Sequence, residues 1–231
     1  KETRVDILVT PLVTIFSGVG LSMLIAAPIG TAASQVGTLI MWATEQAPLA
    51  MGILVSVIVG VALTLPISSA AICAALGLTG LAGGAAVAGC CAQMIGFAVM
   101  SYKENGVGGL VSQGLGTSML QMGNIVKNPR IWIAPTLASA ITGPLATCVF
   151  HFEMNGAAVS SGMGTCGLVG QIGVYTGWVS DIAAGTKAAI TPMDWAAMVL
   201  LCFVLPAVLS VIFCEIERKL GWIKEGDLKL N

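Results

Sequence analysis

The sequence predicts an all-α, polytopic integral membrane protein whose full crossings alternate with broken helices and re-entrant hairpins. Of its 231 residues, 56% are hydrophobic and 9% are charged, against about 25% charged residues in an ordinary soluble domain. No Asp, Glu, Lys, Arg or His occurs over about 57 residues between positions 46 and 102. A single crossing needs about 20 apolar residues, so this stretch alone can hold two or three. The chain is therefore predicted to lie in a lipid bilayer.

Charge and length limit the classes of function. The formal net charge is −1, which gives no field that would attract nucleic acid, and nucleic-acid binding is excluded. Membrane segments use up most of the chain, so no soluble catalytic domain fits, and we expect one transmembrane permease domain over residues 1–231. The chain begins with a charged segment, Lys1 to Asp6, instead of a methionine. This segment does not resemble a cleavable signal peptide, so we expect that an N-terminal part of the full-length protein is missing.

The first apolar run extends from about residue 7 to residue 44, and Pro28 and Gly30 divide it. We expect one crossing near 7–27. The stretch that follows is more polar and is expected to lie at the membrane interface. Its polar residues are Thr31, Ser34, Gln35 and Thr38.

Pro48 and Pro66 break the long uncharged stretch, because proline lacks the amide proton that a helix interior needs. We expect crossings near 49–65 and 83–101. The short piece between them, from 67 to 80, is predicted to form a half-helix.

Two later runs, 131–150 and 195–214, each have the length of one crossing. Basic residues precede the first run and follow the second, and cytoplasmic loops are enriched in Lys and Arg. Both flanks are therefore expected on the cytoplasmic side, which requires an even number of crossings between them. These basic residues are Lys127, Arg130, Arg218, Lys219 and Lys224.

The segment 154–180 lies between these two crossings and cannot be a third, so we predict a re-entrant hairpin. Its seven glycines weaken a continuous helix by roughly 1 kcal/mol each relative to alanine. Irregular backbone at membrane depth is tolerated only where protein or a watered cavity satisfies its polar groups, so the hairpin is expected to line a cavity. The alternative is a glycine-rich helix packed closely on its neighbours.

A short pattern occurs twice. Residues 114–118 read GLGTS and are followed by Gln121, and residues 162–166 read GMGTC and are followed by Gln171. A true internal repeat would fit a transporter built of two related halves whose broken helices meet near the substrate. In a chain with 29 glycines, a chance match is the alternative.

His151 is the only histidine, and it lies in the sequence HFEMNG between a crossing and the predicted hairpin. On an extended segment His151, Glu153 and Asn155 line one side, where they can bind the hydroxyl groups of a polyol. Ionisable groups near membrane depth are functional by default. The alternative is a solvated external loop, and Asp181, Lys187 and Asp194 are interpreted as ordinary loop charges.

Polar residues of the hairpin and of the first repeat copy complete the predicted solute site. For each of these residues the alternative is a hydrogen bond between helices. The candidates are His151, Glu153, Asn155, Ser161, Thr165, Gln171, Gln113, Thr117, Gln121 and Asn124. No cofactor or metal is expected, because the seven cysteines form no CxxC pair and are interpreted as free thiols, and no ATP-binding motif is present.

Two blocks carry a family resemblance. Residues 128–140 (NPRIWIAPTLASA) and 154–171 (MNGAAVSSGMGTCGLVGQ) resemble the PfoR-like branch of the sugar IIC membrane components of the phosphotransferase system. The likeness extends over most of the chain and is densest from about 105 to 178.

The resemblance implies a permease that binds a sugar in the membrane and presents it to a cytoplasmic IIB phosphocarrier, and we expect it to act as a homodimer in a bacterial cytoplasmic membrane. It also implies that a Glu and a His hold the hydroxyl group that is phosphorylated, for which Glu153 and His151 are the counterparts here. One element is missing, because the chain lacks the Gly-apolar-x-Glu-Pro motif of better-known members. A membrane sensor without transport and an ion-coupled secondary carrier are the alternatives.

Overall fold

The computed structural model describes the backbone of residues 6–230 and their side chains except those of 6–10 and 21–27. Within this part the regular elements are α-helices joined by short 3-10 and π-helical turns, so the predicted all-α class is confirmed. The α-helices are α1 (Asp6–Gln46), α2 (Pro48–Thr64), α3 (Ser69–Leu76), α4 (Gly80–Met100), α5 (Tyr102–Val111), α6 (Met122–Lys127), α7 (Ile133–Pro144), α8 (Val169–Ala183), α9 (Pro192–Val199) and α10 (Leu205–Lys219).

Several helical stretches of the described residues are long and apolar enough to cross a membrane, and each overlaps a crossing predicted from the sequence. These stretches are Gly80–Met100, Pro129–Val149 and Pro192–Lys219. The crossing predicted at 49–65 is α2, an apolar helix of 17 residues. The half-helix predicted at 67–80 is α3. The lengths and hydropathy of these elements are those of a polytopic membrane protein.

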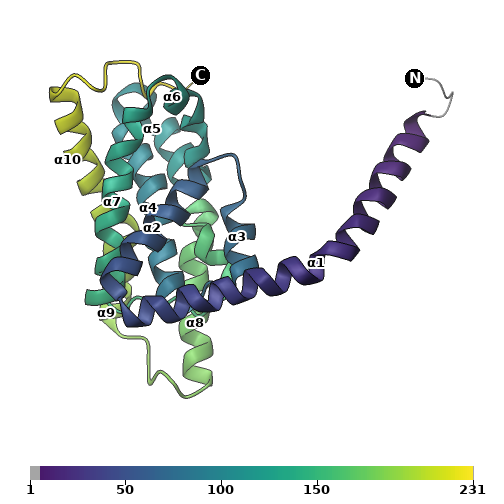
Figure 1. Ribbon diagram of the computed structural model, residues 1–231. Coiled ribbons are helices and arrows are strands. Elements are labelled where there is room, and N and C mark those ends of the chain that lie inside the picture. Colours follow the sequence, from purple (N-terminus) through teal and green to yellow (C-terminus); the bar gives the residue numbers. More distant parts are fainter. Residues whose placement is uncertain (1–5, 231) are drawn as a thin grey trace.

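Helix α4 lies at the centre of the bundle, between α2, α7 and α10 (Figure 1). Its residues are mostly Gly, Ala and Cys and are almost all buried. A side chain at Gly89 would overlap the backbone oxygen of Ser56 in α2, and one at Gly96 would lie 2.5 Å from Ser210 Oγ in α10. Small residues therefore let the neighbouring helices approach closely, as is common where helices pack in membranes. All seven cysteines are free, as predicted.

The helix break predicted at Pro28 and Gly30 is wrong, because α1 continues through both residues. A proline inside a helix removes one backbone hydrogen bond and bends the helix without having to end it. Figure 1 shows α1 changing direction between an arm that leaves the bundle and a part that runs across its lower end. Residues 11–20 of the arm are exposed. We call the end of the bundle with α8 and α9 the lower end, and the end with α6 and the C-terminal residues the upper end (Figure 1).

Two helical hairpins lie between the long helices. The upper hairpin, residues 102–128, consists of α5, a π-helical turn at Ser112–Gly116, a 3-10 turn at Ser118–Gln121 and α6. It begins and finishes at the upper end of the bundle (Figure 1).

The lower hairpin, residues 151–183, begins and finishes at the opposite end (Figure 1). Its first arm is extended and then forms short 3-10 turns, and its second arm is α8. Between the arms Gly164 and Gly167 have φ of 53° and Leu168 has φ of 59°, a left-handed conformation that interrupts a right-handed helix. The alternative of one continuous glycine-rich helix is therefore not observed.

The tips of the two hairpins meet inside the bundle. The hydroxyl group of Thr165 in the lower hairpin donates a 2.5 Å hydrogen bond to the carbonyl oxygen of Gly114 in the upper hairpin. The same hydroxyl lies 3.6 Å from the sulfur atom of Met94 in α4. The two copies of the short sequence pattern, 114–118 and 162–166, thus lie at or beside these tips.

Candidate functional site

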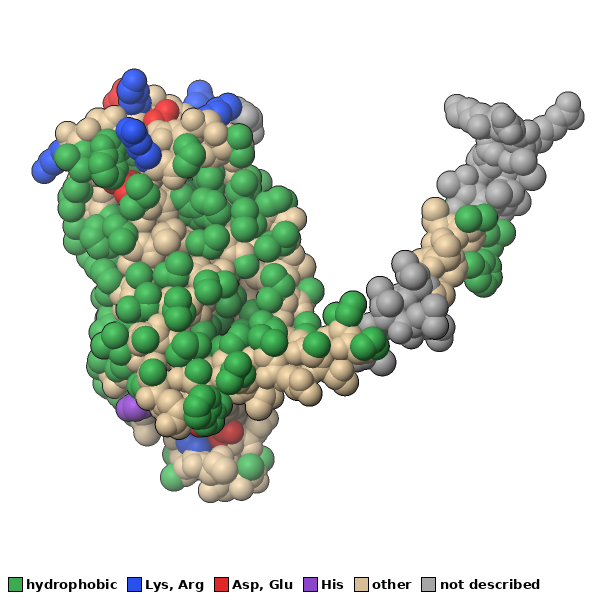
Figure 2. All heavy atoms as spheres, viewed as in Figure 1, with side chains coloured by type: hydrophobic (Ala, Val, Ile, Leu, Met, Phe, Trp, Pro, Cys, Tyr) green, Lys and Arg blue, Asp and Glu red, His purple; other side chains and the backbone are tan. Residues whose placement is uncertain are grey.

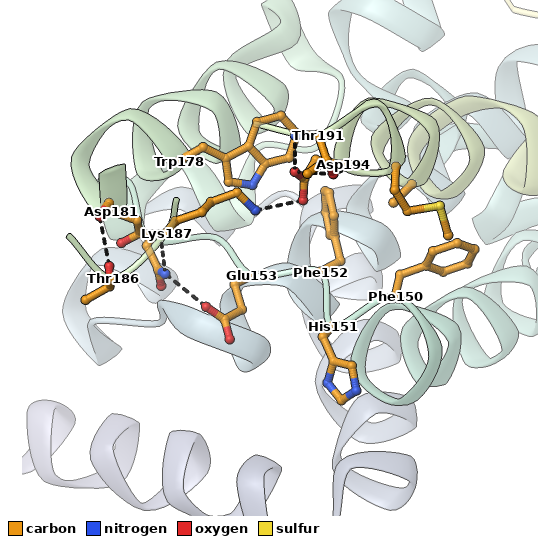
Figure 3. A pocket seen from close by; sticks show the side chains of 13 residues that line it. Phe150, His151, Phe152, Glu153, Trp178, Asp181, Thr186, Lys187, Thr191 and Asp194 are labelled. Carbon is orange, nitrogen blue, oxygen red and sulfur yellow. Dashed lines mark hydrogen bonds and ion pairs between the residues drawn. The ribbon is translucent and has the colours of Figure 1, made fainter. Parts of the chain in front are cut away.

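A pocket of about 550 Å³ opens at the lower end of the molecule, between the first arm of the lower hairpin, the end of α8 and the start of α9 (Figure 3). Its charged and polar lining includes His151, Glu153 and Asn155, three of the predicted site residues. Aromatic side chains form part of its wall. The full lining is Phe150, His151, Phe152, Glu153, Asn155, Trp178, Asp181, Thr186, Lys187, Thr191, Met193, Asp194 and Ala197.

The local backbone explains why the three predicted residues face the pocket. The amide of Phe152 donates a 2.8 Å hydrogen bond to the carbonyl oxygen of Ala146, and Met154 and Gly80 exchange two backbone hydrogen bonds of 3.0 Å. These bonds hold residues 152–154 extended, while His151 before them has φ of 43°. Phe152 and Met154 are buried, and His151 and Glu153 are exposed. The alternation expected of an extended segment is present.

One amide joins two acidic side chains of the pocket. Asn155 Nδ2 donates hydrogen bonds to Glu153 Oε2 at 3.0 Å and to Asp181 Oδ2 at 2.9 Å. Both protons of the amide are thereby used. Glu153 and Asp181 are thus held together by a neutral donor, so the negative charge of this wall is not compensated there.

Lys187 and Asp194 of the same pocket neutralise each other. Lys187 Nζ forms a 2.8 Å ion pair with Asp194 Oδ1 and lies 5.7 Å from the centre of the Trp178 ring. Asp194 also accepts hydrogen bonds from the backbone and hydroxyl groups of Thr191, which form a capping box at the start of α9. The Trp178 ring packs edge-on against Trp195 at 5.6 Å. Lys187 is therefore held in place by charge and by an aromatic face.

This second half of the pocket was not predicted from the sequence, in which Asp181, Lys187 and Asp194 were interpreted as loop charges. A signal was available in the predicted hairpin itself. A hairpin that returns to its starting side brings residues after 180 to the same end as residues 151–155. Residues of both arms can then share one pocket.

The other predicted residues of the lower hairpin lie away from the pocket, inside the bundle. The hydroxyl group of Ser161 donates to the carbonyl oxygen of Leu78 at 3.0 Å, and Thr165 joins the hairpin tips as described. Gln171 Nε2 donates to the sulfur atom of Cys91 at 3.2 Å, while Gln171 Oε1 is buried without a partner among the described residues. Such hydrogen bonds within the bundle are the alternative to a role in binding the solute.

The predicted residues of the upper hairpin lie in a third place. Gln121 Nε2 donates to Gln113 Oε1 at 2.9 Å, and Asn124 Nδ2 donates to Gln121 Oε1 at 2.8 Å. Thr117 accepts a hydrogen bond from the backbone of Met119. The structure therefore brings His151, Glu153 and Asn155 together in a pocket and leaves the other seven candidates outside its lining.

The pocket chemistry is that of a site for a small polar molecule. Carboxylates accept hydrogen bonds from hydroxyl groups, and the imidazole of His151 can donate or accept. Aromatic side chains supply apolar faces beside them. Among the residues whose side chains are described, no group of three His, Cys, Asp or Glu residues is placed to hold a metal ion.

A comparison with protein-family models adds the family. The model for the EIIC component of the phosphotransferase system matches residues 1–230. Searches of curated proteins and of solved structures gave no significant match. The match spans nearly the whole chain and agrees with the apolar helices described above. The chain therefore belongs to the phosphotransferase system EIIC family and is a multi-pass membrane component of sugar transport.

Proposed function

We propose that the protein is a sugar permease of the PfoR-like branch and that the lower pocket receives the sugar. The supporting observation is the lining, in which carboxylate, amide and imidazole groups stand beside aromatic rings in a hollow of about 550 Å³. A sugar combines hydroxyl groups, which such polar groups bind, with an apolar ring face, which aromatic side chains contact. The volume is within the range of about 300–1,000 Å³ typical of small-molecule sites.

The distribution of charge supports one orientation of the protein in a bacterial cytoplasmic membrane. Figure 2 shows Lys and Arg side chains gathered at the upper end of the visible face, whereas the lower end carries His and acidic groups with little positive charge. Cytoplasmic loops carry the excess of Lys and Arg. The upper end then faces the cytoplasm and the pocket opens to the outside.

In this orientation both hairpins are re-entrant, and their tips meet between the two membrane faces. The contact between Thr165 and Gly114 would then close a path for the sugar between the pocket and the upper end. Transport then requires the hairpins to separate, with one part of the bundle moving relative to the other. The glycines at the tips tolerate the necessary backbone changes.

The cytoplasmic IIB phosphocarrier would bind at the basic upper end, and the permease would act as a homodimer. His151 and Glu153 lie at the opposite end, where a cytoplasmic protein does not reach them. In the arrangement described here they would therefore bind the arriving sugar. Their role in holding the hydroxyl group for phosphorylation requires the inward-facing arrangement of the hairpins.

The experiment is equilibrium binding of a panel of radiolabelled sugars to the purified protein. Glu153→Gln removes a charged acceptor and should weaken binding of the recognised sugar at least tenfold. The matched control is Glu45→Gln, a change of an exposed glutamate that does not line the pocket. Equal thermal unfolding of both variants shows that they are folded. Unchanged binding by Glu153→Gln would remove the pocket from the proposal.

Reconstituted vesicles separate transport from the alternatives. A permease exchanges labelled for unlabelled sugar across the membrane, whereas a sensor binds the sugar without exchange. An ion-coupled carrier accumulates sugar with an ion gradient and needs no phosphocarrier. Counterflow without an ion gradient is the expected result.

A further inference from the structure

The C-terminal segment, residues 222–230, lies on the upper hairpin and is called here the tail. It has no regular helix and forms turns. Ile223 and Leu228 are 3% and 0% exposed, and they belong to the same buried cluster as Ile125 of the upper hairpin. The tail is thus anchored by two apolar side chains at the basic end of the molecule.

Side-chain amides of the upper hairpin bind the backbone of three successive tail residues. The carbonyl oxygen of Leu228 accepts hydrogen bonds from Asn105 Nδ2 at 2.8 Å and from Gln121 Nε2 at 3.0 Å. The carbonyl oxygen of Lys229 accepts one from Asn124 Nδ2 at 2.9 Å.

Leu230, the last of the three residues, is bound as well. The backbone amide of Leu230 donates a 2.8 Å hydrogen bond to Asn105 Oδ1. Each of these bonds joins a hairpin side chain to the tail backbone. If the tail leaves, water can form the same hydrogen bonds with the hairpin side chains. This distinguishes the tail from the helices, whose backbone groups are satisfied within each helix.

Hydrogen bonds connect these amides to the place where the two hairpin tips meet. Gln121 also donates to Gln113 Oε1. Gln113 precedes Gly114, whose carbonyl oxygen accepts the hydrogen bond from Thr165 of the lower hairpin. The tail therefore holds the same part of the upper hairpin that has to move when the tips separate.

One glycine just before the tail and one inside it adopt left-handed backbone conformations. Gly221, two residues after the end of α10, has φ of 72°, and Gly226 has φ of 92°, values that residues with a side chain rarely adopt. Neither position would bring a Cβ atom within 4 Å of another group, but the backbone amide of Gly226 donates a 3.3 Å hydrogen bond to Glu104 Oε1 of the upper hairpin, so only Gly221 lies outside the contact with the hairpin. Movement at Gly221 would detach the tail and uncover the apolar cluster that Ile223 and Leu228 share with Ile125, with Phe97 of α4 and with Ile131.

We propose that the tail is a detachable latch that holds the upper hairpin closed at the basic end and must release before the hairpin tips separate. When the latch is seated, the amides of Asn105, Gln121 and Asn124 are occupied by tail backbone. When it is released, these amides and the apolar surface around Ile125 face water. The latch gives the basic end a closed and an open state within one fold.

The experiment measures access to Ile125→Cys in the full chain reconstituted in nanodiscs. The rate of labelling by a membrane-impermeant maleimide is followed by mass spectrometry of the peptide that contains this cysteine, so native thiols do not interfere. Leu228→Ser removes one anchor and leaves the amides in place, and it should speed labelling at least tenfold. The matched control, Leu220→Ser, changes a leucine that is 57% exposed and should leave the rate unchanged.

A disulfide tests the latch in the opposite direction. Asn105→Cys combined with Leu230→Cys should join hairpin and tail when oxidised, slow labelling of Ile125→Cys at least tenfold and recover on reduction. Equal rates in the oxidised and reduced forms would overturn the proposal, and this comparison also decides the case if Leu228→Ser does not fold. Sugar counterflow is measured in parallel and should be lost only in the oxidised form. If no variant moves sugar while labelling follows the latch, the proposed function fails and the latch stands.

Discussion

The contact between α4 and the first arm of the lower hairpin can be tested at one atom. Gly84 of α4 faces the backbone of Phe152, and a Cβ atom at Gly84 would overlap the carbonyl oxygen of that residue. The obstacle is backbone that is itself tied by hydrogen bonds on both sides, from Phe152 to Ala146 and between Met154 and Gly80. Gly84→Ala therefore has to displace the arm that carries His151 and Glu153.

The magnitude follows from two opposing effects. Forcing an extra methyl group into a packed interior costs about 1–3 kcal/mol, while alanine improves helix propensity over glycine by about 1 kcal/mol. Because the obstacle is hydrogen-bonded backbone, the upper end of the cost applies, and the net expectation is a loss of about 2 kcal/mol in the free energy of unfolding. For a chain of this length, 1 kcal/mol shifts the melting temperature by roughly 2–4 °C, so we expect a decrease of about 4–8 °C.

The assay is thermal unfolding of the purified protein in detergent, with Gly108→Ala as the matched control. Gly108 lies in α5, and a Cβ atom there would meet no other group within 4 Å. The control should gain stability of up to about 1 kcal/mol from helix propensity alone. If Gly84→Ala is as stable as Gly108→Ala, the close approach of α4 to the pocket arm is refuted.

Further substitutions test the pocket, a buried carboxylate and the hairpin contact. Asn155→Leu removes the amide shared by Glu153 and Asp181, and the repelling carboxylates should separate and weaken sugar binding at least tenfold in the equilibrium assay. Glu217 is 3% exposed and neither carboxylate oxygen has a partner among the described residues, so Glu217→Gln should raise stability by about 1 kcal/mol or more, since a buried unpaired charge is costly. A lower melting temperature for that variant would contradict this reading. Thr165→Val removes the hydrogen bond to the other hairpin tip and should lower the free energy of unfolding by about 1 kcal/mol. Because this bond lies where the proposed path is closed, sugar uptake into vesicles should also change.

Hydropathy and proline positions predicted most of the elements correctly. The ends of α2 and the position of α3 follow from Pro48 and Pro66, because proline acts on the backbone wherever the segment lies. The helix break predicted at Pro28 was wrong because the prediction used the local effect of proline alone. A proline can bend a helix or end it, and the residues around it decide which, so the sequence rule could not separate the two for α1.

The candidate site was predicted in part. The alternation of His151, Glu153 and Asn155 is local and could be deduced from an extended segment. The contribution of Asp181, Lys187 and Asp194 could not, because these residues reach the pocket only through the return of the lower hairpin. The binding of the tail by polar residues of the upper hairpin could not be predicted. These residues bind backbone groups of the tail, and every sequence has the same backbone groups.

The sequence by itself determined that the chain is helical and that it crosses the membrane several times. These properties depend on the transfer of each segment between water and lipid and on backbone preferences, which act locally. Only the tertiary structure decided that two hairpins enter from opposite ends, that their tips meet at Thr165 and Gly114, and that the tail covers one of them. Such contacts join groups far apart in the chain and depend on how closely small residues such as Gly84 and Gly89 let backbones approach, which no local pattern records.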